Sequence, residues 1–394
     1  MPVSTELFPD ESMRPTRVEV DLGQLGRNLQ AIRQHVGAAG VMAVVKANAY
    51  GHGLVPVAHE MVRAGADGLG VALLEEAVLL REAGITTPIL VFGGIAAAQL
   101  PIFLRHQLTL TAPSVEKLDL IDQAAAAMGT VARVHLKIDT GMERLGIHYY
   151  SAERLLEASL RVRHVQVEGI YSHFANADAA DLSHARLQLT RFHEVVSFYE
   201  KRSLPTPQRH IANSAGILQL PESHLDLVRP GILLYGVAPS RECPLRLAVA
   251  PALAWKSHVA YFKVVLPGHP VSYGSTWVSD HPVRMVTVPV GYGDGYFRAL
   301  SNKGQVLIRG QRHPIAGRVC MDQIMVNLEW GTAYYRDEVV LLGSQGEERI
   351  TPEDLADWAG TISYEVLTNI NARVPRVYYR TCGEETALSS LPAR

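Results

Sequence analysis

Short runs of valine, isoleucine and leucine alternate with longer amphipathic stretches from residue 17 to about residue 236. The short runs have the length and β-branched content of strands, and the longer ones repeat apolar residues at helical spacing. Nine runs are expected to be strands: RVEVD (17–21), VMAVVK (41–46), GLGVA (68–72), PILVF (88–92), LTLT (108–111), RVHLKI (133–138), VEGIYS (167–172), RHIA (209–212) and DLVRP (226–230). Because strands that alternate with helices form parallel sheets with the helices outside, the pattern predicts a (β/α)8 TIM-type barrel with one accessory or miscounted strand. An open doubly wound sheet is the main alternative.

Two of the amphipathic stretches carry clear helix signals. Apolar residues recur at helical spacing over 22–32, and Asp21 with Gln24 has the spacing of a capping box at the start of that helix. A second helix is expected over 55–62. Each follows a predicted strand, as the βαβ rhythm requires.

The pattern changes after about residue 240, where strand-like runs follow one another with glycine and proline between them. These runs are LAWKSHVAYFKVV (253–265), RMVTVPV (284–290), QVLIRG (305–310), IMVNL (324–328) and DEVVLLG (337–343). Thr351 followed by Pro352 predicts the start of a helix near the end. We therefore expect two domains, a barrel over 11–242 and a mostly β domain over 243–394.

Composition narrows the choice of partners. The chain of 394 residues is 47% hydrophobic and 19% charged with a net charge of −2, which indicates a globular protein that binds neither nucleic acid nor a membrane surface. Cys243, Cys320 and Cys382 form no CxxC pair and are odd in number, which favours a reducing cytoplasm over a disulfide framework. No apolar export segment or membrane span is recognisable, so a cytoplasmic protein with a small ligand is expected.

The predicted strand over 41–46 ends on a lysine, Lys46. In a parallel barrel the reactive groups lie at the carboxyl ends of the strands. Burial beside Val44 and Val45 would lower the pKa of the ammonium from its reference of about 10.4, and the neutral amine could then add to a carbonyl. The pattern favours Schiff-base chemistry, although a strand-end lysine can also simply reach into solvent.

Groups that bind anions recur at three further places. Tyr50 is followed by a glycine-rich turn, HIANSAG opens a short helix at Ser214, and VRPGI places Arg229 before the amides of Gly231 and Ile232. Helix starts and glycine amides attract phosphate. A lysine for an aldehyde together with donors for a phosphate suggests pyridoxal 5′-phosphate (PLP) as the cofactor.

The residues around Lys46 also resemble the cofactor-attachment segment of the alanine racemase family, and the resemblance continues in family order through both domains. The motifs are AVVKANAYGHG, LKIDTGMERLG, YSHFANAD, HIANSAG, VRPGILLYG, VSYGSTW, VGYGDGY, GRVCMDQ, ISYEV and RVPR. The resemblance implies a PLP-dependent homodimer that interconverts L-alanine and D-alanine and supplies D-alanine for cell-wall peptidoglycan. It also implies roles for single residues.

By this resemblance, Lys46 would carry the cofactor and act as the base on one face of the substrate Cα. Tyr273 of the partner subunit would be the base on the other face, because inversion needs a proton removed on one side and returned on the other. Arg229 would face the pyridine nitrogen, His210 would hydrogen-bond Arg229, and His173 would pack beside the ring. A permanently charged guanidinium cannot give a full proton to that ring.

The resemblance also implies two sets of binding residues. The phosphate would be held by residues of both domains: Tyr50, Asn213, Ser214, Gly231, Ile232 and Tyr364. Arg144 would orient the cofactor oxygen and the substrate carboxylate. Lys137 corresponds to a lysine that is carbamylated in many members and would then position Arg144. The pocket would be closed by Met321 and Asp322 of the partner subunit, with Tyr292 at its entrance.

Other readings stay open at this point. A broader amino-acid racemase, a PLP barrel decarboxylase and a PLP-binding protein without turnover are the alternatives, and VSYGSTW, the missing export signal and the β domain argue against them. Departures from the family pattern at Glu143, Trp277 and Gly293 leave the substrate breadth open. GYGDG is interpreted as a turn, and the His173, Asp178, Asp181 and His184 cluster as a polar loop, so no metal site is expected.

Overall fold

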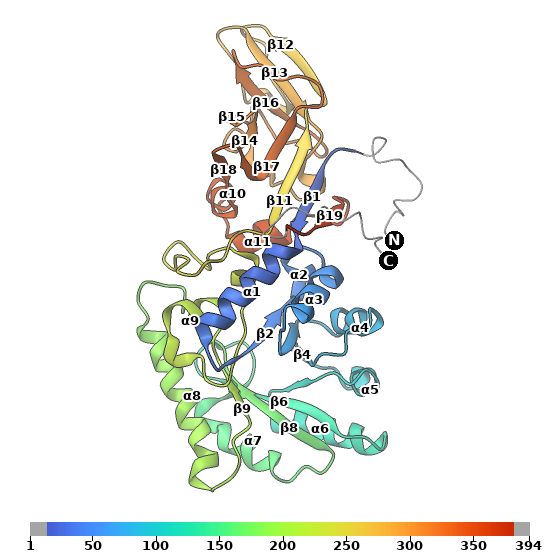
Figure 1. Cartoon of the computed structure of the whole chain (residues 1–394), viewed down its shortest axis with the longest axis vertical. Helices are drawn as coiled ribbons and strands as arrows, with labels where there is room; N and C mark the ends of the chain where they lie inside the picture. The colour runs from blue at the N-terminus through green and yellow to red at the C-terminus, as the bar shows by residue number, and fades with distance from the viewer. Residues whose placement is uncertain (1–13, 382–394) are drawn as a thin grey trace. The chain divides into compact units, whose positions relative to one another are not determined.

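The computed structural model describes residues 14–381, and the description below is confined to them (Figure 1). These residues form two compact units, one of residues 25–251 and one of residues 14–24 with 252–381. The expected ranges of 11–242 and 243–394 differ from this division chiefly because the first strand joins the second unit. Cys382 lies outside the described residues.

The first unit is a closed barrel of eight parallel strands within the described residues. The strands are β2 (Gly40–Val44), β3 (Gly68–Val71), β4 (Ile89–Val91), β5 (Leu110–Ala112), β6 (Ala132–Asp139), β8 (Val165–Tyr171), β9 (Gln208–His210) and β10 (Leu227–Val228). They pair in the orders β10-β2-β3-β4 and β5-β6-β8-β9. A parallel bridge between Leu90 and Thr109 joins β4 to β5, and the Arg229 amide donates to Ala212 O at 3.0 Å, linking the β9 and β10 ends. The predicted barrel is confirmed, and the open doubly wound alternative is wrong.

Helices follow most strands and lie outside the barrel (Figure 1). The α-helices are α1 (Leu22–Val36), α3 (Leu54–Arg63), α4 (Leu74–Glu82), α5 (Leu100–Arg105), α6 (Val115–Ala127), α7 (Ala152–Ser159), α8 (Ser183–Lys201) and α9 (Ser214–Gln219). The segment labelled α2 (Lys46–Tyr50) is instead a left-handed turn. Shorter elements are β7 (Ile147–His148), η3 (Ala97–Gln99), η4 (Tyr149–Ser151), η5 (Pro221–Ser223) and η6 (Ile232–Tyr235). The two predicted helices are α1 and α3, and Asp21 Oδ1 accepts from the Gln24 amide at 3.0 Å at the start of α1.

The first predicted strand has a different place from the one expected. It is β1 (Arg17–Asp21), which pairs antiparallel with β11 (Leu253–His258) and parallel with β19 (Arg376–Tyr379) instead of joining the barrel. Val18 and Val20 are fully buried on one face of the sheet that β1 forms with β11 and β19. Alternating burial predicts that a run is a strand, but it does not specify which strands lie beside it.

The second unit contains two β-sheets. The other strands are β12 (Tyr261–Val265), β13 (Val283–Val288), β14 (Gln305–Ile308), β15 (Gln311–Pro314), β16 (Ile324–Glu329), β17 (Glu338–Gln345) and β18 (Glu348–Ile350). The larger sheet has the order β15-β14-β17-β11-β1-β19 with β18 on β17, and the smaller one β12-β13-β16. The run expected over 253–265 is therefore two strands in different sheets, β11 and β12, because the chain leaves the larger sheet at Val259 and Ala260.

Short helical segments complete this unit. They are η7 (Tyr273–Ser275), η8 (Tyr292–Asp294), η9 (Arg298–Leu300), α10 (Pro352–Ala359) and α11 (Ser363–Thr368). The predicted helix start is confirmed: Thr351 Oγ1 accepts from the Asp354 amide at 3.1 Å, and Asp354 Oδ2 accepts from the Thr351 amide at 2.9 Å.

Candidate active site

Lys46 lies two residues beyond the buried carboxyl end of β2, after the buried Val45, and is itself half-buried. Burial lowers the pKa of its ammonium group, and the positive charge of Arg144 lowers it further, while Glu76 opposes both effects. These are the causes that favour a neutral, nucleophilic amine at the mouth of a barrel. The lysine therefore has the environment that Schiff-base chemistry requires.

The chain leaves Lys46 through a left-handed turn. Four consecutive residues other than glycine, Ala47 to Tyr50, have φ angles between 51° and 54°. This conformation costs roughly 1–2 kcal/mol per residue, so surrounding contacts must hold it. Glu76 Oε1 accepts from the Ala47 amide at 2.6 Å, and Asn48 Oδ1 accepts from the Leu54 amide at 2.8 Å. The turn brings the buried Tyr50 back beside the strand end that carries Lys46.

The three segments expected to bind phosphate meet in this unit. A Cβ atom on Gly231 would lie 2.3 Å from Tyr50 Oη, so only glycine lets this phenol approach the backbone. Ser214 Oγ accepts from the amides of Gly231 and Leu233 at 2.9 and 3.2 Å, while Asn213 caps α9 by accepting from the Gly216 amide. The hydroxyl groups of Tyr50 and Ser214 lie near the first backbone amides of α9 and of η6, which begins at Ile232. Together these groups form an anion cradle whose chemistry fits a phosphate group.

Arg229 lies fully inside the barrel end, 3% exposed. Its Nη1 donates to His210 Nδ1 at 2.6 Å, and its Nη2 donates to the carbonyls of Ser172 at 2.7 Å and Ile211 at 3.2 Å. Nη2 also lies 3.4 Å from His173 Nδ1. Burial lowers the pKa of Arg229 to about 10, which still leaves the guanidinium charged near neutral pH.

A chain of imidazoles continues from Arg229. Because a guanidinium can only donate, His210 accepts at Nδ1, carries its proton at Nε2 and donates to His135 Nδ1 at 2.8 Å. Burial and the Arg229 charge lower the pKa of His210 and bring that of His135 to about 3, so both rings are neutral. The Tyr171 ring stacks parallel to His210 with centroids 4.8 Å apart. The relay therefore holds Arg229 in one orientation.

His135 and Tyr171 were not among the predicted site residues. A signal for His135 exists in the sequence, since His135, Lys137 and Asp139 alternate with buried Val, Leu and Ile along β6. Successive residues of a strand face opposite sides, so these polar groups share one face. Nothing comparable marks Tyr171, whose neighbours in β8 are mixed in character.

Lys137 and Arg144 flank the loop after β6. Lys137 is buried, and burial together with the charge of Arg229 holds its pKa well below the usual range. Its Nζ lies 4.7 Å above the Tyr171 ring. The loop is shaped by Asp139, which accepts from the backbone amides of Gly141, Met142 and Arg144 at 2.8 to 3.1 Å.

Three residues predicted to act from the partner subunit are exposed on the second unit. Tyr273 is 70% exposed, Tyr292 43% and Met321 53%. The loops that carry the last two are adjacent, because the Tyr292 amide donates to Cys320 O at 3.0 Å. The exposed side chains of these adjacent loops are available for contact with another molecule.

The remaining predicted residues of this unit are Asp322 and Tyr364. Asp322 Oδ1 accepts from Arg373 Nη2 at 2.5 Å. Tyr364 lies in α11, where its carbonyl accepts from Thr368 Oγ1 at 2.8 Å.

Metal ligands and membrane-spanning helices are both absent from residues 14–381. No group of three or more His, Cys, Asp or Glu side chains there is placed to hold a metal ion. In the same range no helix is long and apolar enough to cross a membrane. In the polar loop before α8, Asp181 Oδ1 accepts from the Ser183 amide at 2.9 Å, and His184 Nδ1 lies 2.9 Å from Asn176 Oδ1.

A parallel barrel whose strand ends gather a low-pKa lysine, a buried arginine and an anion cradle defines an enzyme of the α/β-barrel class. Comparison with known protein families shows which family of such enzymes the chain resembles. The model of the alanine racemase N-terminal domain matches residues 20–239, and that of the alanine racemase C-terminal domain matches residues 252–378. The chain belongs to the alanine racemase family, and it is an isomerase with alanine racemase activity.

Individual relatives cover nearly the whole chain. The alanine racemase of Carboxydothermus hydrogenoformans is 46% identical over 368 residues, which are 93% of this chain and 100% of that protein. The crystal structure of alanine racemase from the D-cycloserine producer Streptomyces lavendulae matches with a TM-score of 0.90 and 39% identity, covering 94% of this chain and 98% of that one. Alanine racemase from Bartonella henselae, solved with covalently bound pyridoxal phosphate, has a TM-score of 0.85 and 28% identity over 93% of this chain and 100% of that one.

Proposed function

We propose that the chain racemises alanine with two bases, Lys46 on one face of the substrate Cα and Tyr273 of the partner subunit on the other. The observation that carries this proposal is the low-pKa lysine at the carboxyl end of β2, next to an anion cradle. The enzyme uses pyridoxal 5′-phosphate, which is covalently bound in the related Bartonella henselae protein. When bound, this group supplies an electron-accepting ring that stabilises negative charge at Cα.

The residues of the barrel unit would divide the binding work. Tyr50, Ser214 and the amides of Gly231 and Ile232 would hold the phosphate, with Asn213 fixing the start of α9. Arg229 would face the ring nitrogen and leave it unprotonated, because a guanidinium whose pKa is about 10 keeps its protons near pH 7. His173 would pack beside the ring. With Arg229 in this place, less charge would be delocalised into the ring, and return of the proton to Cα would be favoured.

Lys46 would then exchange one proton with the substrate Cα. A depressed pKa makes the amine unprotonated for a larger fraction of molecules near neutral pH, which a base requires. Arg144 would bind the substrate carboxylate as a bidentate partner. We further propose that Lys137 is carbamylated, since a buried amine whose pKa lies well below the usual range is a nucleophile towards carbon dioxide, and that the carbamate orients Arg144.

The second unit would complete the site of a neighbouring molecule in a homodimer. Exposure of Tyr273, Tyr292 and Met321 supports this part of the proposal. Tyr273 would be the second base, Met321 and Asp322 would close the substrate pocket, and Tyr292 would line its entrance. Tyr364 would contribute to phosphate binding.

The domain boundaries and cellular role belong to the same proposal. Residues 11–242, apart from the strand β1 that pairs with β11 and β19, would form the cofactor domain and residues 243–394 the C-terminal domain, which the family matches over 20–239 and 252–378 support. We place the enzyme in the cytoplasm, where it would supply D-alanine for peptidoglycan.

The test is a chiral assay with purified protein and added PLP, using L-alanine, D-alanine and serine as substrates. We expect a yellow protein that converts each alanine enantiomer into the other. Lys46→Ala should lose activity in both directions by several orders of magnitude, whereas Lys201→Ala, which removes an exposed lysine at the end of α8, should not. A colourless protein without PLP uptake, or sustained racemisation by the Lys46→Ala variant, would contradict the proposal.

A further inference from the structure

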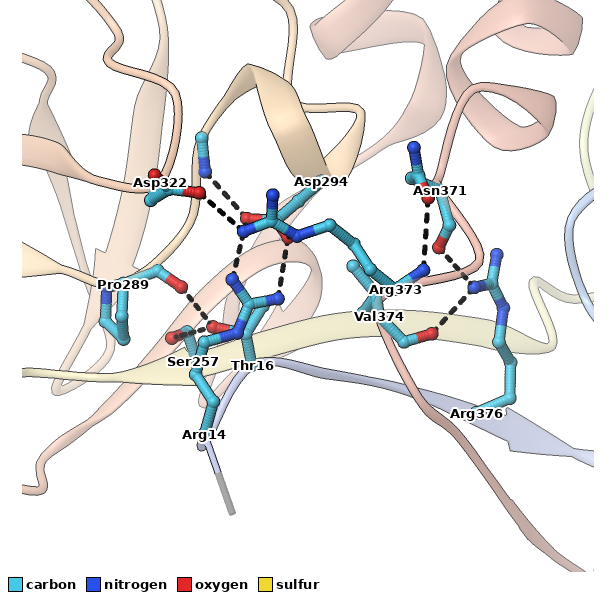
Figure 2. A network of polar contacts seen from close by, with 11 residues as sticks. Arg14, Thr16, Ser257, Pro289, Asp294, Asp322, Asn371, Arg373, Val374 and Arg376 are labelled. Atoms are coloured by element: carbon cyan, nitrogen blue, oxygen red, sulfur yellow. Dashed lines mark hydrogen bonds and ion pairs between the residues drawn. The ribbon is translucent and has the colours of Figure 1, made fainter. Parts of the chain in front are cut away.

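A buried carboxylate ends η8, the segment that begins at Tyr292. Asp294 is fully buried, and two arginines from distant parts of the sequence converge on it (Figure 2). Arg14 contacts both carboxylate oxygens, at 2.6 and 3.1 Å, and Arg373 Nε contacts Oδ1 at 2.9 Å. The Gly291 amide also donates to Oδ2 at 2.9 Å. A buried charge needs such partners, because it has lost its hydration.

Arg373 also reaches a second carboxylate. Its Nη2 lies 2.5 Å from Asp322 Oδ1, so one guanidinium bridges the buried Asp294 and the exposed Asp322, as Figure 2 shows. The planar fork of arginine suits this double contact, which the single point charge of lysine cannot reproduce. Asp322 directly follows Met321, and Asp294 follows Tyr292 by two residues.

The two loops are in close contact where Arg373 joins them. The Gly293 amide donates to Met321 O at 2.8 Å, parallel to the bond from Tyr292 to Cys320. A Cβ atom on Gly293 would lie 2.6 Å from Arg373 Nη1 and 3.0 Å from Met321 O. The guanidinium therefore packs over the point where the loops touch, and a side chain there would force it away.

We propose that Arg373 is a positioning residue that holds the Tyr292 and Met321 loops in register, and that it thereby sets the size of the amino acid the enzyme accepts. The inference rests on the proposed function, in which these two loops close the substrate pocket. Arg373 itself would touch neither substrate nor cofactor. Exposed ion pairs contribute little to stability, so the bridge between Arg373 and Asp322 has its main effect on loop position.

The test compares Arg373→Gln, Arg373→Lys and Asp322→Asn with the natural enzyme, all loaded with PLP. For Arg373→Gln we expect KM for alanine to rise about tenfold while kcat changes by no more than about twofold, because Lys46 and Tyr273 are untouched. The ratio of kcat/KM for serine to that for alanine should rise about threefold or more. Arg373→Lys should recover only part of the loss, since it reaches one carboxylate.

The matched control is Arg312→Gln. Arg312 also bridges two acidic residues of the same unit, Glu348 at 2.7 Å and Asp354 at 3.9 Å, but neither belongs to the two loops. It should leave KM and the serine preference unchanged. Because Arg373→Gln could unfold the unit by leaving Asp294 with fewer partners, Asp322→Asn provides a second test that keeps the buried contacts.

Two outcomes overturn the inference. One is a natural enzyme that racemises alanine while Asp322→Asn and every folded Arg373 variant keep its KM and serine ratio. The other is a loss confined to kcat with KM unchanged, which would place Arg373 in the chemistry instead of the pocket. Failure of the natural enzyme to racemise any amino acid would instead defeat the proposed function, so the two failures are distinguishable.

Discussion

Burial and the charge of Arg229 set the pKa of several side chains around Arg229. The side chains of Lys137, His173 and His210 each have a lowered pKa, and in each case burial is the largest cause and Arg229 the next. One fixed positive charge thus adds to burial in lowering the pKa of several neighbours. Arg229 therefore places a positive charge at the barrel end, which suits an anionic cofactor and substrate.

Gly231 is the position where adding one methyl group should test the anion cradle most directly. Its Cβ in Gly231→Ala would lie 2.3 Å from Tyr50 Oη, so the phenol must move away from the anion cradle. We expect PLP affinity to fall at least about tenfold, measured by spectroscopic titration. Gly94→Ala is the control, since nothing lies within 4 Å of its Cβ position. Equal PLP affinity in the two variants would remove Gly231 from the cradle.

At the scale of elements, the left-handed turn after β2 is the part that no strand or helix pattern describes. It places four residues in a conformation that β-carbons disfavour, and Glu76 and Asn48 hold it through backbone amides. The strain is concentrated next to Lys46. Such a turn gives a short, stiff connection between the lysine and Tyr50.

This interpretation predicts that replacing alanine by glycine changes the free energy of unfolding in opposite directions inside the left-handed turn and inside a helix. Ala47→Gly, in the left-handed turn and exposed, should raise the free energy of unfolding by about 0.5 kcal/mol, because relief of strain exceeds the added chain entropy. Ala126→Gly, exposed within α6, should lower it by about 0.5–1 kcal/mol. Urea unfolding of both variants measures the difference, and destabilisation by Ala47→Gly would show that the turn is unstrained in solution.

At the scale of the whole molecule, the predicted site residues fall into two groups on two units. Lys46, Arg229 and the anion cradle lie in the barrel, whereas Tyr273, Met321 and Asp322 lie in the second unit. A homodimer with shared sites would unite one group from each molecule. This arrangement can be tested without a structure of the assembly.

Mixed dimers supply the test. Lys46→Ala and Tyr273→Phe subunits, each of low activity alone, should regain about a quarter of the natural activity when unfolded together and refolded in equal amounts. About half of the dimers would be mixed, and each would contain one site with both bases intact. Mixing each variant with itself is the control. No recovery in dimers shown to be mixed would place Lys46 and Tyr273 of one site on the same subunit.

Much of this protein was predictable from the sequence by itself. Strand and helix periodicity defined the barrel and the β-rich second part, and local chemistry located Lys46, the helix start at Ser214 and the cap at Thr351. These features depend on neighbours within a few residues, which the sequence displays directly. The resemblance of ten motifs to one family pointed to the activity.

Only the tertiary structure decided which distant residues meet. In the structure, β1 lies outside the barrel and pairs with β11 and β19. His135 and Tyr171 contact His210, which holds Arg229. Arg14 and Arg373 both bind Asp294. Strand partners and ion pairs across hundreds of residues leave no periodic trace in a sequence. Their geometry comes from packing of the whole chain, in which each buried polar group must find a partner.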